Sequence, residues 1–112
     1  MKHTTPCGIA LGAGPREAFE RARATDPVSA FGGIAAFNTV VTADAAQAMA
    51  DLFLEVVVAP SFHDDALAVL AAKKQLRVVE LPVGQGEGQL DYKRVRGGFL
   101  VQDRFVVDPE DI

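Results

Sequence analysis

The chain has 112 residues, of which 49% are hydrophobic and 23% charged, and its formal net charge is −4. This balance fits one globular domain with a modest core, and the acidic excess argues against a nucleic-acid partner, because clustered Lys and Arg drive such binding. Cys7 is the only cysteine, so no intramolecular disulfide can form and a cytoplasmic location is expected. The sequence has no long apolar run and no charged-then-apolar leader, so neither a membrane span nor a signal peptide is expected.

The first residues concentrate reactive groups. A primary amine, an imidazole, a proline turn and a thiol lie between Lys2 and Gly8. A lysine can hold a developing negative charge while the neutral imidazole of His3 takes a proton, which is the logic of acyl transfer. A solvated chain terminus is the alternative interpretation of the same residues.

A helix of about ten residues is expected after Pro15, with Glu17 and Arg21 spaced four apart on its outer face. The glycines before it can expose N–H groups to phosphate, but their spacing matches neither the dinucleotide nor the P-loop pattern, so a plain loop is favoured. Asp26 and Pro27 end this helix, because a residue before proline avoids helical backbone angles.

Three apolar segments, near residues 34–38, 55–59 and 76–81, are expected as strands separated by helices. Thr42 is expected to cap the second helix, with an inner face of Ala45, Ala46, Met49, Leu52 and Phe53. The third helix starts at Ser61 or at the acidic pair 64–65, with a core stripe of Ala66, Leu67, Val69 and Leu70. This alternation predicts an α/β fold with parallel strands and intervening helices.

The last part of the chain has a different pattern. Residues 92–96 and 99–103 flank Gly97 and Gly98, which is typical of a two-residue turn between antiparallel strands. We therefore expect a C-terminal β-hairpin after the parallel sheet.

Two blocks of sequence carry a resemblance to a known family. Residues 2–8 read Lys-His-Thr-Thr-Pro-Cys-Gly, and residues 25–34 read Thr-Asp-Pro-Val-Ser-Ala-Phe-Gly-Gly-Ile. They resemble the corresponding motifs of the AICAR transformylase domain of the bifunctional purine-biosynthesis enzymes that also carry an IMP cyclohydrolase domain. Further matches follow at 55–60, 73–74 and 91–104, so the resemblance spans nearly the whole chain. It implies a partial transformylase domain over residues 1–112, similar to a cytidine-deaminase-like subdomain, without the cyclohydrolase domain.

The resemblance implies a reaction and a site. It implies formyl transfer from 10-formyltetrahydrofolate, as co-substrate, to the nucleotide AICAR in purine (IMP) biosynthesis. His3 would be the proton acceptor and Lys2 the transition-state stabiliser, while Phe31, Gly32, Glu55 and Lys74 would contact the nucleotide.

Structural interpretations stay open beside these roles. Phe31 is equally expected as a buried residue at a strand entry, Glu55 as a solvated carboxylate at an edge, and Lys74 as a helix-end cation. No metal is expected, because Pro6 and Cys7 lack the second cysteine of a zinc deaminase motif.

Departures from the family pattern define the remaining expectations. Thr5 replaces the usual Asn, and Met1 stands where relatives have an apolar strand leading into Lys-His. We therefore expect an N-terminal fragment or truncated homologue with no turnover alone and weak AICAR binding, and an open sheet edge that favours a homo-oligomer. The alternative is a non-catalytic α/β module for nucleotide binding or association.

Overall fold

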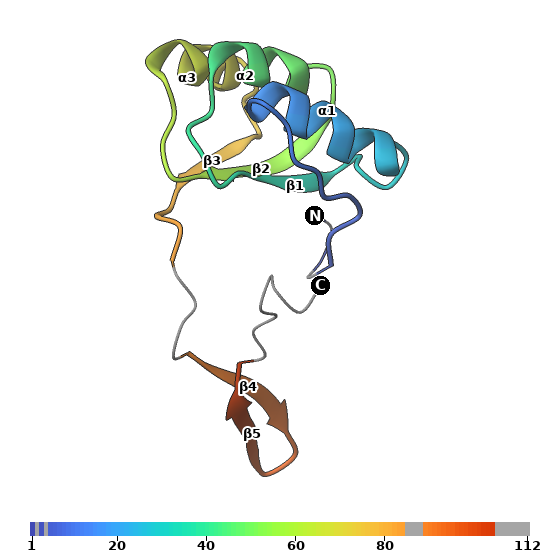
Figure 1. Cartoon of the computed structure of the whole chain (residues 1–112), viewed down its shortest axis with the longest axis vertical. Coiled ribbons are helices and arrows are strands. Elements are labelled where there is room, and N and C mark those ends of the chain that lie inside the picture. Colours follow the sequence, from blue (N-terminus) through green and yellow to red (C-terminus); the bar gives the residue numbers. More distant parts are fainter. Residues whose placement is uncertain (2, 4, 85–88, 105–112) are drawn as a thin grey trace.

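A computed structural model describes residues 1, 3, 5–84 and 89–104 (Figure 1). The described chain is α/β: a three-stranded parallel sheet interleaved with helices precedes an antiparallel hairpin, which confirms the expected fold class. The helices are α1 (Pro15–Thr25), α2 (Ala43–Met49) and α3 (Asp64–Ala71). The strands are β1 (Gly33–Ala36), β2 (Leu54–Ala59), β3 (Arg77–Glu80), β4 (Leu90–Val95) and β5 (Gly98–Asp103).

The parallel sheet has the strand order β1-β2-β3. Val57 in the central strand pairs with Ala35 on one side and with Val78 on the other. Beyond the named strands, Val41 and Phe62 form a parallel bridge at the entrances to α2 and α3. The expected strands are therefore adjacent and parallel, and their ends differ from the expected ones by at most two residues.

All three helices lie on the same side of this sheet (Figure 1). The core forms between them and the helix-facing side of the strands, where burial of a side chain such as Met49 or Leu70 contributes roughly 1.5–3 kcal/mol. Its buried members are Phe19, Val41, Ala45, Ala46, Met49, Leu52, Leu54, Val57, Ala59, Ala66 and Leu70. Within the described residues no helix is long and apolar enough to cross a membrane.

Two expected core positions are wrong. Phe53 is 41% exposed because α2 already ends at Met49, so the helical spacing that placed Phe53 on the inner face no longer applies there. Leu67 is 40% exposed because α3 starts at Asp64 and directs Ala66 and Leu70 into the core. The rest of both stripes is buried or packed against the core.

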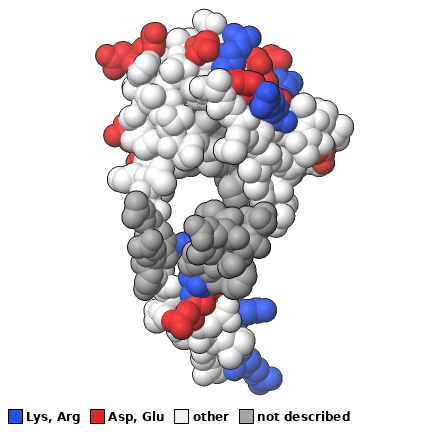
Figure 2. Space-filling view, in the orientation of Figure 1, with Lys and Arg blue, Asp and Glu red and all other residues white. Residues whose placement is uncertain are grey.

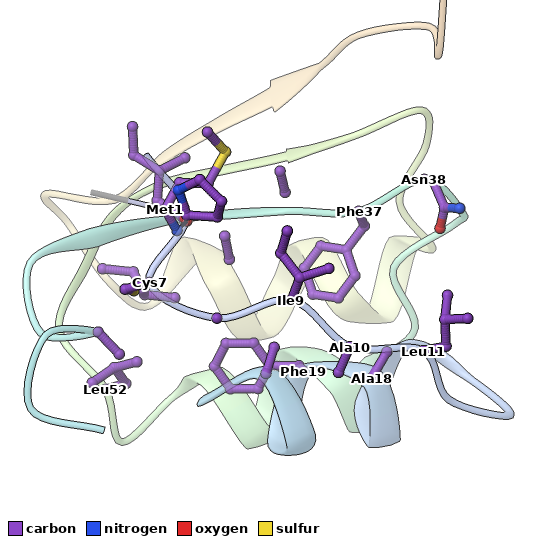
Figure 3. Close-up of a pocket in the computed structure, with 18 residues that line it drawn as sticks. Met1, Cys7, Ile9, Ala10, Leu11, Ala18, Phe19, Phe37, Asn38 and Leu52 are labelled. Carbon is purple, nitrogen blue, oxygen red and sulfur yellow. Dashed lines mark hydrogen bonds between the residues drawn. The ribbon is translucent and has the colours of Figure 1, made fainter. Parts of the chain in front are cut away.

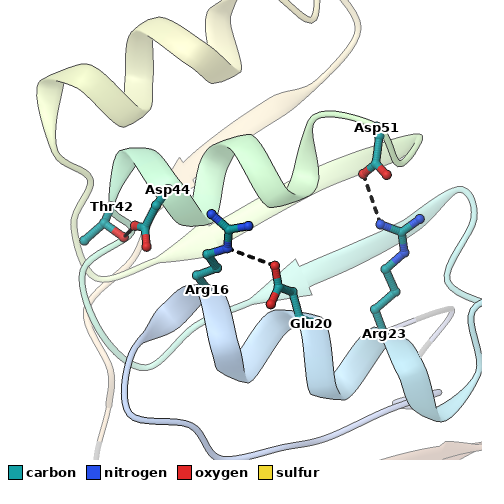
Figure 4. A network of polar contacts seen from close by, with 6 residues as sticks. All are labelled: Arg16, Glu20, Arg23, Thr42, Asp44 and Asp51. Atoms are coloured by element: carbon teal, nitrogen blue, oxygen red, sulfur yellow. Dashed lines mark hydrogen bonds and ion pairs between the residues drawn. The ribbon is translucent and has the colours of Figure 1, made fainter.

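Ion pairs decorate the outer surface of α1. Glu17 and Arg21 approach to 2.6 Å, as their spacing predicts, and Arg16 and Glu20 pair at 2.9 Å. Arg23 reaches out of the helix to Asp51, 3.0 Å away just after α2 (Figure 4). Because these side chains are largely solvated, each pair contributes little to the free energy of unfolding.

Thr42 occupies the N-cap position of α2, but it does not cap the helix in the expected way. Its hydroxyl donates to the Asp44 carboxylate rather than accepting from a backbone N–H (Figure 4). This hydrogen bond to the charged form, helped by backbone N–H groups of the first turn, lowers the pKa of Asp44 below its ordinary value of 3.8.

Replacing Thr42 by Ala should therefore raise the pKa of Asp44 toward its ordinary value. The pKa of Asp44 is lower in the folded than in the unfolded chain. The hydrogen bond from Thr42 therefore stabilises the folded state fully above the unfolded pKa, and this stabilisation disappears as pH falls through the folded-state pKa. NMR titration of the Asp44 carboxyl carbon measures the shift, with Asp65 as internal control. An unchanged Asp44 pKa in the variant would contradict the assignment of this hydrogen bond.

The hairpin lies apart from the parallel sheet (Figure 1). Val95 pairs with Gly98, so the two-residue turn consists of Arg96 and Gly97 rather than of the expected Gly97 and Gly98. Gly97 has φ of +88°, a left-handed conformation that glycine adopts without strain, whereas Gly98 already belongs to β5. The hairpin is confirmed, with its turn shifted by one residue.

Candidate functional site

An irregularity in the sheet directs Glu55 outward. Gly33 pairs with Leu54, yet the next residue, Ile34, pairs with Val56, so Glu55 is an extra residue in β2. Strict alternation would place Leu54 and Val57 on opposite faces, but the bulge lets both enter the core while Glu55 stays exposed. A charged residue in an apolar strand is thereby accommodated without burial.

Glu55 and Lys74 line the same pocket, of about 470 Å³, at the amino ends of β2 and β3. Arg77, the first residue of β3, contributes a second cation, and the remaining lining residues are Phe53, Gln75 and Leu76. One carboxylate and two cations beside an aromatic ring suit a small anionic ligand with hydrogen-bond donors. Open α/β sheets more commonly bind ligands at the carboxyl ends of their strands.

Phe53 connects this pocket to the loop that precedes β1. The ring centroids of Phe31 and Phe53 lie 5.2 Å apart, and the N–H of Gly32 donates a hydrogen bond of 2.8 Å to the carbonyl oxygen of Phe53. Gly32 has φ of +70°, which disfavours any side chain there, although the space beside the Phe53 ring would admit one. Phe31 is 62% exposed, so the interpretation of this residue as a buried strand-entry side chain is wrong.

The N-terminal segment approaches the same end of the sheet. Met1 and Ile34 exchange backbone hydrogen bonds, with the carbonyl of Met1 accepting from Ile34 N–H at 2.7 Å. Gly33 permits this approach, since a Cβ there would lie 2.8 Å from the Met1 carbonyl oxygen. Met1 is thus held beside the edge of β1, although it belongs to no strand of the sheet.

His3 is exposed and has φ of +56°, a left-handed conformation that is uncommon outside glycine and clusters at functional sites. Two residues span at most about 7 Å, which keeps His3 near the start of β1. Its side chain is not part of the described pocket lining. The expected catalytic residue Lys2 lies outside the described residues.

Two glycines seat the N-terminal segment on α1. A Cβ on Gly8 would stand 2.0 Å from the carbonyl oxygen of Ala22, and one on Gly12 would stand 2.5 Å from the N of Ala18. Arg21 reinforces the contact by donating to the carbonyl of Leu11 at 3.1 Å. The course of the segment that carries His3 therefore depends on close backbone packing against α1.

A second pocket of about 500 Å³ lies between this segment, α1 and β1. Phe19 and Phe37, with ring centroids 6.4 Å apart, lie beside Ile9, and Asn38 stands at one end (Figure 3). No charged side chain lines this cavity among the described residues. It is therefore less suited to a phosphorylated ligand than the pocket at Glu55 and Lys74.

The structure brings together four of the expected site residues and separates another. Glu55 and Lys74 share a pocket, and Phe31 and Gly32 reach it through Phe53, whereas His3 stands at the adjacent end of β1. Sequence reasoning missed Phe53 and Arg77 as pocket residues. The sequence features that could have identified them are their positions: the aromatic Phe53 stands two residues before Glu55, and the cation Arg77 stands three residues after Lys74.

The fold and the pocket define an α/β protein with a polar, cation-lined site at the amino ends of its strands. The sequence matches the family model described as the AICARFT/IMPCHase bienzyme over residues 1–111. The chain therefore belongs to the AICAR transformylase/IMP cyclohydrolase family, which is a family of purine-biosynthesis enzymes.

Proposed function

We propose that this chain supplies part of the site for formyl transfer from 10-formyltetrahydrofolate to AICAR. The observation that carries the proposal is the joining of Glu55 and Lys74 in one pocket, beside the Phe31–Phe53 ring pair, in a chain of this family. Glu55, Lys74 and Phe53 line a single space, and the Phe31 ring packs against the Phe53 ring at its border. The proposed localisation is the cytoplasm.

Binding in this pocket would use its charges in different ways. Lys74 provides a flexible ammonium donor for the nucleotide phosphate, while Glu55 accepts hydrogen bonds from N–H or hydroxyl groups. The exposed ring of Phe31 offers a face to the planar base, and Gly32 leaves room for a close backbone approach. The phosphate and the base are thus recognised by different edges of the site.

The chemistry requires a base and a cation. The amino group of AICAR is a weak nucleophile because its lone pair is delocalised into the ring and carboxamide. Its nitrogen forms a bond to the formyl carbon and His3 accepts the amine proton. The bond from that carbon to the folate nitrogen then breaks, and the departing nitrogen takes up a proton, which protonated His3 can return. Lys2 is proposed to stabilise the intermediate oxyanion. General-base help is worth roughly 10² to 10⁴ in rate, and an oxyanion partner roughly 10² to 10³.

The isolated chain is proposed to bind AICAR weakly and not to turn over. His3 is exposed and the pocket is open to solvent, whereas catalysis requires groups held within about 0.5 Å of their working positions. A homo-oligomer is proposed to provide further walls around the site.

A non-catalytic nucleotide-binding module is the second candidate. It is favoured by the pocket lining, which the chain builds from Phe53, Glu55 and residues 74–77 without His3. Binding without turnover is expected of the isolated chain under either candidate, so the two differ only when the site is complete.

A formyl-transfer assay separates these outcomes. The chain alone, with AICAR and 10-formyltetrahydrofolate, should give no more product than its His3→Ala variant. Turnover above that variant would overturn the proposed inactivity of the isolated chain. An enzyme that carries this segment and stays fully active with His3→Ala would favour the non-catalytic candidate.

A further inference from the structure

β1 is an edge strand of the parallel sheet, and the described residues pair only part of its outer edge. At its start, Ile34 exchanges hydrogen bonds with Met1 on the side away from β2. Just after its end, the N–H of Phe37 donates to Val58 in β2, so the C=O of Ala36, which points the opposite way in the same trans peptide, faces outward. The N–H of Ala36 faces outward as well, because alternate residues of a strand bond to the same side.

These two outward groups of Ala36 have no hydrogen-bond partner among the described residues. An edge strand offers such groups to whatever lies beside it. Since β1 ends at Ala36 and Met1 already pairs with Ile34, the free edge within β1 is one residue long. Strand addition by a peptide needs a series of main-chain bonds, whereas a single residue suits a small molecule with one donor and one acceptor.

The free edge borders the cavity of about 500 Å³ between β1, α1 and the N-terminal segment. Ala36, Phe37 and Asn38 line it from the strand side, and the ring of Phe37 lies beside Ile9 and Phe19 (Figure 3). Ile9 is 78% exposed, so this wall keeps a large aliphatic side chain in water. Small-molecule sites are hollows of roughly 300–1,000 Å³ that combine apolar walls with a few polar groups, and this cavity has both.

We propose that this cavity binds a neutral, planar heteroaromatic ring that carries a hydrogen-bond donor beside an acceptor, as a nucleobase does. The ring acceptor receives the N–H of Ala36, and the ring donor binds the C=O of the same residue. Ile9 and Phe37 cover one face of the ring, where apolar and aromatic contacts replace water. The side-chain amide of Asn38, which can donate and accept, serves a substituent at the end of the ring. The proposal is independent of the pocket proposed for AICAR.

The charge of the cavity selects a neutral ligand. Among the described residues no charged side chain lines it, and the α-amino group of Met1 at its border already donates to the carbonyl of Ile34. On the visible face of the molecule, charged side chains gather over the helices and on the hairpin (Figure 2). A phosphate in the cavity would lose hydration without gaining a cation, which is costly. The site therefore favours a free base over its nucleotide, the reverse of the preference proposed for the pocket at Glu55 and Lys74.

Titration of the isotope-labelled full chain with 2-aminopurine, followed by NMR, tests the proposal. This ligand is neutral and has an amino donor next to a ring nitrogen. The amide proton of Ala36 should shift downfield and saturate, with a dissociation constant of roughly 0.1–1 mM for a ligand of this size. Quinoline, of similar size, has an acceptor without an adjacent donor and should bind at least about 10-fold more weakly. No saturable shift at Ala36, or equal affinity for both ligands, would overturn the proposal.

Replacing Ala36 by Pro removes the donor while leaving the pairing with β2 intact, because this N–H faces away from the sheet and proline is tolerated on such an edge. Ala36→Val is the matched control, since it keeps both backbone groups. We expect Ala36→Pro to weaken binding at least about 10-fold and Ala36→Val to change it less than about twofold, both measured at the side-chain amide of Asn38. Equal affinity in Ala36→Pro and the wild type would rule out recognition by the strand edge.

A second pair of variants leaves the backbone of β1 unchanged. Ile9→Glu places a carboxylate beside the ring, and Val28→Glu, at a position that is 83% exposed and outside the lining, is the control. Binding of 2-aminopurine should fall at least about 10-fold in Ile9→Glu and stay unchanged in Val28→Glu. The corresponding nucleoside monophosphate should bind here at least about 10-fold more weakly than the base. Full binding in Ile9→Glu, or equal binding of base and nucleotide at Ala36, would contradict the proposed site.

Discussion

Replacing His3 by Ala, in an active enzyme that carries this segment, is expected to lower formyl transfer by roughly 10² or more while AICAR affinity changes far less. The reason is that His3, the proposed proton acceptor, stands near the start of β1 and outside the pocket lined by Glu55 and Lys74, so we expect its removal to affect proton transfer rather than nucleotide binding. Single-turnover rates beside a calorimetric titration with AICAR give both quantities. Equal loss of rate and affinity would assign His3 to substrate positioning instead.

Gly8→Ala is expected to cause a second large loss without touching the pocket. The added methyl would lie 2.0 Å from the Ala22 carbonyl oxygen, so the N-terminal segment must move away from α1. Misplacing a catalytic group by about 1 Å can cost about 10² in rate, and His3 belongs to this segment. The change should leave the core between the helices and the sheet intact.

Gly14→Ala is the matched control, because nothing lies within 4 Å of its added methyl and its φ is −157°. Rates of both variants, with circular dichroism to verify the fold, measure the effect. Full activity in Gly8→Ala would show that seating of the segment on α1 does not position His3. Loss of activity in Gly14→Ala as well would point to a general sensitivity of this loop.

Much of the fold follows from local sequence signals. Three apolar strands separated by helical stripes predict the parallel sheet, and a glycine between alternating strands predicts the hairpin. The errors arise where tertiary context overrides periodicity. Phe53 fits the stripe of α2, but the chain leaves the helix before reaching it and turns the ring toward Phe31.

The candidate site is less accessible from sequence. The family motifs predict Glu55 and Lys74 individually as candidate site residues, but no local pattern reveals the bulge that turns Glu55 outward or the strand pairing that brings Arg77 to the same pocket. Such features depend on register between strands that are distant in sequence. The same limit applies to Thr42. Its residue type predicts its position at the N-cap of α2, but not the hydrogen bond from its hydroxyl to the Asp44 carboxylate.

Calorimetric titration of the chain with AICAR tests most directly whether the pocket at Glu55 and Lys74 binds the nucleotide, as we propose. We expect weak, saturable binding that Lys74→Ala reduces about 10-fold or more, that the unphosphorylated riboside reproduces only in part, and that Leu67→Ala on α3 leaves unchanged. Undetectable binding, or affinity equal in the wild type and Lys74→Ala, would contradict the account.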